Sequence, residues 1–292
     1  MHKGTRGINF MIKHYVAITK PKIIFGNGIT AIGGFMLASL HAIQTPVFAA
    51  MLLGLSCIIA SACVCNNYID RAIDEKMART KMRSLVIKAI SGPQALLFAS
   101  SLLLVGSMLL IAYTNMLTLS CALVGFAVYV FAYSPLKHSS PHATLVGSIA
   151  GACPIVVGYV AAKNCLDLGA LLLFILVVLW QMPHFYAIAL YRLDDYKQAL
   201  VPVLPLTRGV LATKKEMLYY IAAFSIASVM PTLCGYTGYA YFTIALIASL
   251  SWLKICLQGF SCTDDTSWAR RMFIYSLIVI MVLCGAMSFD GI

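Results

Sequence analysis

Hydrophobic residues along the chain are gathered into nine long runs, and the segments between them are polar and mostly short. Each run is close to the roughly 20 residues that an α-helix needs to cross the hydrocarbon core of a bilayer. The runs lie near residues 23–42, 46–66, 94–113, 116–134, 143–162, 168–190, 216–235, 238–258 and 271–289. The pattern predicts an all-α polytopic protein with nine transmembrane helices, folded as one membrane-embedded domain over residues 1–292.

The distribution of charge predicts the orientation of these helices. With the N-terminus in the cytoplasm, all Lys and Arg residues except Lys163 lie on the cytoplasmic side, as the positive-inside rule requires. The acidic residues follow the same division, with Asp167 and Asp290 as the exceptions. The rule makes no demand on acidic residues, so their clustering favours an active site at the cytoplasmic face.

Composition narrows the class of protein further. Of 292 residues, 61% are hydrophobic and 11% are charged, too few charges to cover the surface of a water-soluble domain. The formal net charge is +11, and the charged residues lie between the apolar runs. Membrane topology and an anionic substrate explain this excess of basic residues better than nucleic-acid binding does. The ten cysteines include no C-x-x-C pair, which favours buried packing thiols over a metal or disulfide role. The first apolar run follows a basic leader and indicates a membrane helix, not a cleaved signal.

A first group of polar residues follows the second apolar run. Asn66, Asp70 and Asp74 are four residues apart, so a helix places them on one face. Two carboxylates at that spacing repel each other, and Mg²⁺, which prefers oxygen ligands, would remove the repulsion. Basic residues suited to diphosphate oxygens come next, namely Arg71, Lys76, Arg79, Lys81 and Arg83. The alternative is an ordinary charged helix end leaving the membrane.

This run is similar to the first aspartate-rich motif of the UbiA-type membrane prenyltransferases, N-x-x-x-D-x-x-x-D followed by R-T-x-x-R-P. The matching residues are Asn66, Asp70, Asp74, Arg79, Thr80 and Arg83. Ser84 stands where many members have Pro. Many members also carry a second D-x-x-x-D after the sixth helix, whereas Gln198 and Ala199 occupy the corresponding positions here. The nine-helix topology is the one that this family would have.

Further motifs resemble the branch of this family that farnesylates protohaem. They are W-x-M-P-H-F-Y-A-x-A from Trp180, D-D-Y from Asp194 and V-P-V-L-P from Val201, with shorter matches near residues 19–27 and 133–152. The resemblance implies transfer of the farnesyl group of farnesyl diphosphate to a vinyl group of haem B, with Mg²⁺ as cofactor. Water then adds, which gives the hydroxyethylfarnesyl side chain of haem O for terminal oxidases.

The resemblance also implies roles for individual residues. Asn66, Asp70 and Asp74 would hold the metal, with Asp194 and Asp195 as further candidate ligands, and Arg71 and Lys76 would assist catalysis. The candidate diphosphate ligands are Arg79, Arg83, Arg192 and Lys197, and the candidate haem contacts are His184, Trp180, Tyr191 and Lys137. A histidine near a helix end is equally well explained as a satisfied structural residue, and His138 and His142 are better explained as loop residues.

The expected partners are farnesyl diphosphate, haem B as substrate, the lipid bilayer, and a haem-copper oxidase or haem-modifying enzyme, with no nucleic acid. The expected location is the cell inner membrane, with the active site facing the cytoplasm. One alternative is a UbiA-type enzyme that prenylates an aromatic quinone precursor. Another is a secondary transporter, which should carry ionisable residues near the bilayer midplane; a cytochrome would need paired histidines within the helices.

Overall fold

The computed structural model describes residues 11–39 and 42–292, and all long elements in these ranges are helices. Nine spans within them are long and apolar enough to cross a membrane, which confirms the predicted number. They are α2 (Pro21–Ser39), α3 (Thr45–Asp74), α4 (Gly92–Tyr113), a composite span (Met116–Leu136), α7 (Ala143–Lys163), α8 (Leu168–Tyr191), α11 (Val210–Leu233), α12 (Tyr239–Gln258) and α13 (Asp265–Phe289). The composite span consists of α5 (Met116–Ala127), the π-helix η1 (Val128–Tyr133) and α6 (Ser134–Leu136). Lys3 and Arg6, used to predict the topology, lie outside the described residues.

Most predicted boundaries hold to within three residues, but α11 and α13 begin six residues earlier than predicted, and the end of α3 differs in a way that matters for the site. The second span does not end at residue 66 but continues as one helix to Asp74. The acidic motif therefore lies on a rigid helix that extends beyond the apolar segment, not in the loop that follows it.

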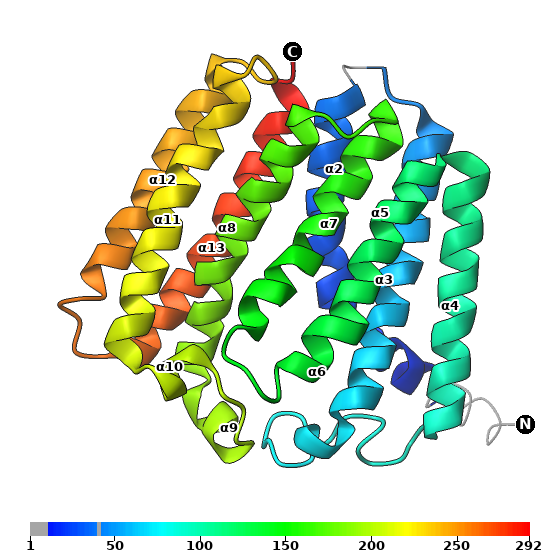
Figure 1. Ribbon diagram of the computed structural model, residues 1–292, viewed down its shortest axis with the longest axis vertical. Coiled ribbons are helices and arrows are strands. Elements are labelled where there is room, and N and C mark those ends of the chain that lie inside the picture. Colours follow the sequence, from blue (N-terminus) through cyan, green and yellow to red (C-terminus); the bar gives the residue numbers. More distant parts are fainter. Residues whose placement is uncertain (1–10, 40–41) are drawn as a thin grey trace, which may run out of the picture.

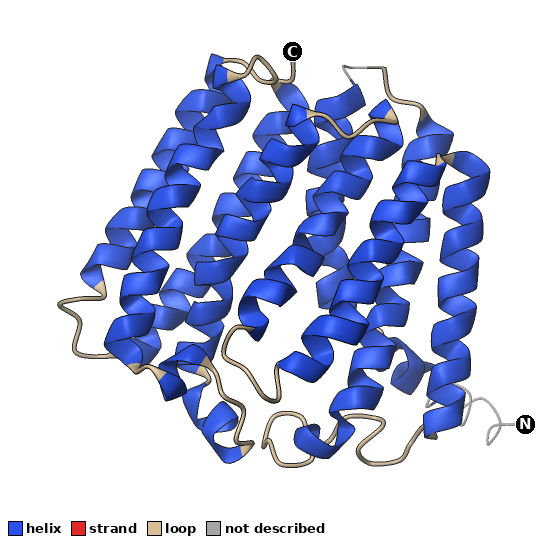
Figure 2. Cartoon of the chain, in the orientation of Figure 1, coloured by secondary structure: helices blue, strands red, loops and turns tan. Residues whose placement is uncertain are grey.

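The helices stand side by side and roughly parallel (Figure 1). In this view α11 and α12 form one edge, α4 forms the other, and α7, α8, α13 and α2 lie between them. The connections at the upper end are short, whereas the lower end carries the loop after α3 and the short helices α9 (Leu193–Gln198) and α10 (Leu204–Thr207) (Figure 2).

The closest helix contact in the centre joins α2 to α7. A Cβ added at Gly34 would lie 2.0 Å from the carbonyl oxygen of Ile155, and one at Gly158 would lie 1.9 Å from that of Ala31. These backbones touch because neither residue has a side chain, as is common between membrane helices.

Aromatic side chains join the other half of the bundle. Phe224 of α11 packs edge-on against Trp252 of α12, and both are fully buried. The Trp180 indole of α8 donates a 2.8 Å hydrogen bond to the carbonyl of Ser276 on α13. Since an indole N–H buried without an acceptor is costly, this bond ties α8 to α13 in one register.

Candidate active site

A chamber of about 1030 Å³ lies inside the bundle. Its walls come from α2, α3, α5, η1, α7, α8 and α13, and they are mainly apolar except at the end near the long loops. This volume is at the upper limit of the roughly 300–1,000 Å³ of small-molecule sites. The chamber can therefore hold a large amphiphile, or parts of two ligands together.

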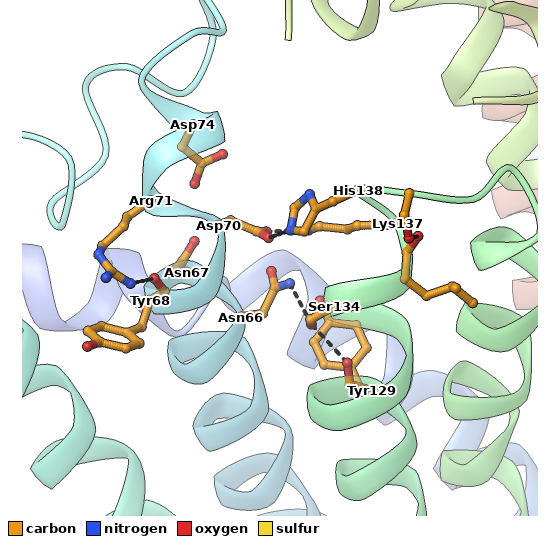
Figure 3. A network of polar contacts seen from close by, with 12 residues as sticks. Asn66, Asn67, Tyr68, Asp70, Arg71, Asp74, Tyr129, Ser134, Lys137 and His138 are labelled. Atoms are coloured by element: carbon orange, nitrogen blue, oxygen red, sulfur yellow. Dashed lines mark hydrogen bonds and ion pairs between the residues drawn. The ribbon is translucent and has the colours of Figure 1, made fainter. Parts of the chain in front are cut away.

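Asn66, Asp70 and Asp74 all line this chamber. They lie on one face of the last two turns of α3, as their spacing predicted, and they are 2%, 4% and 5% exposed. Figure 3 shows Asn66 and Asp70 directed toward the helix end that carries Ser134, Lys137 and His138. Carboxylates buried to this extent need partners, because an isolated buried charge is very costly.

The partners of Asp70 come from the segment after α6. Lys137 forms an ion pair with Asp70 Oδ2, and His138 Nε2 lies 3.3 Å from Oδ1. That geometry makes no hydrogen bond, so Oδ1 is buried without a hydrogen-bond partner among the described residues. Burial first, and then the charge of Lys137, lower the pKa of His138, so the ring is neutral near neutral pH. Asp70 Oδ2 is thus paired with the Lys137 ammonium, whereas Oδ1 accepts no hydrogen bond from a described residue.

The partner of Asp74 comes from the loop after α3. Arg83 donates a 2.5 Å bond to Asp74 Oδ2, and the Thr80 hydroxyl donates a 2.8 Å bond to the Asp74 carbonyl. Arg83 also reaches Asn67 Oδ1 at 3.3 Å. The predicted R-T-x-x-R element therefore folds back over the end of α3 and brings its second arginine into the chamber.

Asn66 joins α3 to two other segments. Its Oδ1 accepts a 2.6 Å bond from Lys20, just before α2, and its Nδ2 donates to Ser134 at 2.9 Å. Ser134 in turn donates to the carbonyl of Tyr129 at 2.8 Å, within the π-helix (Figure 3). π-Helical turns are often found at functional sites. Burial, followed by the charges of Arg83 and Lys137, lowers the pKa of Lys20 to about 8.

Lys20 and Ser134 were not among the predicted site residues. Both belong to segments that the sequence comparison with the prenyltransferases had already marked, the runs at residues 19–27 and 133–137. The motif match was the available signal. Nothing in the local pattern shows that the two segments meet at Asn66.

The oxygen ligands here are of the kind that Mg²⁺ binds. Among the described residues, no three His, Cys, Asp or Glu side chains come close enough to hold a metal by themselves. Mg²⁺ typically uses one or two carboxylates together with substrate phosphates. The free Oδ1 of Asp70, with the Asn66 and Asp74 oxygens on the same helix face, fits that arrangement.

The polar segment between α8 and α11 contributes fewer residues to the chamber than the end of α3 and the loop after it. Asp195 lies 3.8 Å from Arg79 Nε and 3.9 Å from Arg192 Nη1, so the two long loops meet through charge. Met77 also packs with Ala199 and Val201. Tyr196 lines the chamber, and burial raises its pKa to about 12, so the phenol stays protonated and can donate.

Several predicted residues lie elsewhere. Arg71 turns away from Asp70: it donates to the Tyr68 carbonyl at 2.5 Å and covers the Tyr68 ring at 4.2 Å (Figure 3). The described chamber lining does not include Arg71, nor Lys76, Tyr191, Arg192, Asp194, Asp195 and Lys197. Tyr191 packs on Phe273 with the ring centroids 5.6 Å apart. The structure therefore places Asn66, Asp70 and Asp74 at the chamber, whereas the candidate ligands between α8 and α11 are not part of its lining.

The inner wall of the chamber carries Trp180, Gln181 and His184 of α8. The Trp180 and His184 rings stack, with centroids 4.8 Å apart and planes 26° apart. His184 Nδ1 lies 2.7 Å from the Ser276 hydroxyl. A flat aromatic surface with one histidine thus faces the apolar part of the chamber.

The nine apolar spans of the described residues define a class, the multi-pass membrane proteins, and the chamber inside them has a charged rim at one end. The sequence model of the UbiA prenyltransferase family matches residues 27–278. The chain belongs to the UbiA prenyltransferase family.

Relatives and solved structures agree with this assignment. The chain is 48% identical to the protoheme IX farnesyltransferase of Yersinia pseudotuberculosis, over 96% of the chain and 95% of the relative. It is 47% identical to the protein of the same name from Serratia proteamaculans, with the same coverage. A digeranylgeranylglyceryl phosphate synthase structure matches with a TM-score of 0.79 and 18% identity, over 95% of this chain and 99% of that one. A UbiA homologue from Archaeoglobus fulgidus bound to GPP and Mg²⁺ matches with a TM-score of 0.69 and 17% identity, over 94% and 99%. At these identities the two structures show the fold.

Proposed function

We propose that this protein transfers the farnesyl group of farnesyl diphosphate to a vinyl group of haem B and forms the hydroxyethylfarnesyl side chain of haem O. The observation that carries the proposal is 48% identity, over nearly the whole length of both chains, to proteins named protoheme IX farnesyltransferase. The chamber supports it physically, because one end is charged and the rest is apolar. Both proposed substrates are amphiphiles of this form.

The diphosphate would bind at the charged rim. The basic residues that line the chamber are Lys20, Lys22, Arg79, Arg83 and Lys137, and the acidic ones are Asp70 and Asp74. This excess of positive charge suits a diphosphate, whose oxygens form strong charge-assisted hydrogen bonds. Mg²⁺ held by Asn66, Asp70 and Asp74 would neutralise charge on the departing diphosphate oxygen.

Binding at the rim would rearrange the present contacts. Lys20, Arg83 and Lys137 now occupy the oxygens of Asn66, Asp74 and Asp70. A metal that took over the Asn66 and Asp74 oxygens would release Lys20 and Arg83 toward the diphosphate, where they would stabilise the leaving group beside Lys137. Because Lys137 pairs with Asp70, we assign it to the diphosphate end and no longer to haem.

The farnesyl chain would extend into the apolar part of the chamber, which Ile58 and Phe126 help to line. Exclusion of water there protects an allylic cation from hydrolysis. The porphyrin would lie against the stacked rings of Trp180 and His184, near enough for a vinyl group to meet the farnesyl carbon. Tyr191, behind this wall on Phe273, would support it indirectly.

We place the enzyme in the inner membrane with its charged rim at the cytoplasm, supported by the segregation of Lys and Arg. The product would pass to a haem-modifying enzyme or a haem-copper oxidase. A quinone-precursor prenyltransferase is the alternative function, supported only by the shared fold and first motif.

The test is a product assay with purified protein in lipid. Protohaem, farnesyl diphosphate and Mg²⁺ are supplied, and the extracted pigments are weighed by mass spectrometry. We expect haem enlarged by one farnesyl group and one water, and loss of this product when EDTA removes the metal. Unmodified haem, together with a prenylated aromatic acid in a parallel reaction, would establish the alternative.

A further inference from the structure

Gln181 is a buried polar side chain with no structural role that the fold explains. It is 5% exposed, lies on a membrane-spanning helix and lines the chamber. Its Oε1 is buried without a partner, and no hydrogen bond joins its amide to any described residue. Burying an amide oxygen without a hydrogen-bond partner is unfavourable, so its place on the chamber wall points to a bound ligand.

The backbone of α7 is shaped around this amide. A Cβ added at Gly151 would lie 2.3 Å from Gln181 Oε1 and 2.4 Å from Nε2. Gly151 also lines the chamber. The absence of a side chain there is what allows the Gln181 amide to take its position.

The hydrogen bonds of His184 determine which of its nitrogens carries the proton. The Ser276 hydroxyl has one hydrogen, and it donates that hydrogen to the Phe273 carbonyl at 2.6 Å. Ser276 Oγ must therefore accept from His184 Nδ1–H at 2.7 Å. In a neutral imidazole the other nitrogen, Nε2, then has a lone pair and no hydrogen.

Gln181 and His184 are three residues apart on α8, so they share one face of the helix. The face offers an amide that can donate or accept and a histidine nitrogen that can accept. A water molecule satisfies both groups at once, because it can donate one hydrogen to Gln181 Oε1 and the other to His184 Nε2. A propionate or a carbonyl group cannot donate to Nε2, and an apolar chain satisfies neither group.

We propose that Gln181 and His184 hold the water that completes the reaction, an inference that rests on the proposed function. The vinyl π electrons form a bond to farnesyl C1 as the C1–O bond breaks, and that electron pair leaves with the diphosphate. The positive charge left on the vinyl carbon next to the porphyrin ring takes a lone pair of the water. The proton of that water passes to His184 Nε2, and the hydroxyl of the product is complete. Gln181 acts as a positioning residue for this water.

The test is Gln181→Met, which keeps the size of the side chain and removes the amide. Without held water, the cation loses a neighbouring proton and the product is an alkene, lighter than the normal product by one water. We expect the ratio of alkene to hydroxylated product to rise at least tenfold, and the rate of the hydroxylated product to fall roughly 10²-fold, a typical effect of misplacing a reactant. Gln258→Met, the same exchange at an exposed residue at the end of α12, is the control and should leave the ratio unchanged.

Gly151→Ala tests the same amide from α7 and should shift the ratio in the same direction, which protects the test if one variant fails to fold. An unchanged ratio and rate in a folded variant would overturn the proposal. Loss of all farnesylated haem in both folded variants would also overturn it, because Gln181 would then act in haem binding. If the unaltered protein forms no farnesylated haem, the proposed function itself has failed, so the two failures are distinguished.

Discussion

Lys20 allows a quantitative prediction about pH, because its pKa lies within an accessible range. Burial lowers this pKa to about 8, and its amine contacts Asn66 at the rim of the chamber. The amine is therefore roughly 90% protonated at about pH 7 and roughly 10% protonated at about pH 9. An anionic diphosphate favours the charged form, so the affinity is present below a pH of about 8 and is lost as the pH rises through that value.

The size of the effect follows from linkage. If the diphosphate complex restores the pKa of Lys20 to that of an ordinary lysine, the dissociation constant rises about tenfold between about pH 7 and about pH 9, or about 1.4 kcal/mol. The measurement is calorimetric titration of the protein in lipid discs with a non-hydrolysable farnesyl thiodiphosphate and Mg²⁺. Arg keeps its charge throughout this range, so Lys20→Arg should remove the pH dependence.

Lys254→Arg, the same exchange at an exposed position of α12, is the matched control and should keep the pH dependence. The same tenfold weakening in Lys20→Arg would refute the reasoning, since another group would then be responsible. A flat profile in the unaltered protein would refute it as well, because Lys20 would then be fully charged over the whole range.

Three further predictions concern the metal site, the helix contact and a cluster remote from the chamber. Asp70→Asn should lower turnover in the product assay by at least about 10²-fold, because it weakens metal binding and charge stabilisation at the leaving group. The control Asp194→Asn, at an exposed residue, should change turnover less than about threefold. Equal effects of the two substitutions would contradict the assignment of Asp70 to the metal site. Gly158→Ala places a Cβ 1.9 Å from a carbonyl oxygen, and should destabilise the fold by about 2–3 kcal/mol, seen as a lower melting temperature than in Gly285→Ala, which has open space. Lys214→Met removes a buried amine that donates to the Gly259 carbonyl at 2.6 Å. It should lower the free energy of unfolding by about 1–2 kcal/mol and leave transfer activity unchanged. Loss of activity in a stable variant would show that the contacts of Lys214 with Gly259 and Asp265 affect catalysis.

The parts of the site that sequence predicted correctly are the local ones. The alignment of Asn66, Asp70 and Asp74 on one helix face follows from their four-residue spacing alone. The predicted end of the second span was wrong because hydropathy marks where apolar residues stop, whereas the helix continues through polar residues to Asp74.

The sequence by itself determined the class of protein, the number of spans and the residues that carry charge, because chain hydropathy and helical spacing are properties of consecutive residues. Only the tertiary structure decided which charges meet. Asp70 pairs with Lys137, 67 residues away, and His184 with Ser276, 92 residues away. Arg71, adjacent to Asp70 in sequence, faces Tyr68 instead. Neighbours on a helix point in different directions, so the partners of a buried charge depend on which helices pack together, and that depends on contacts such as the glycines between α2 and α7.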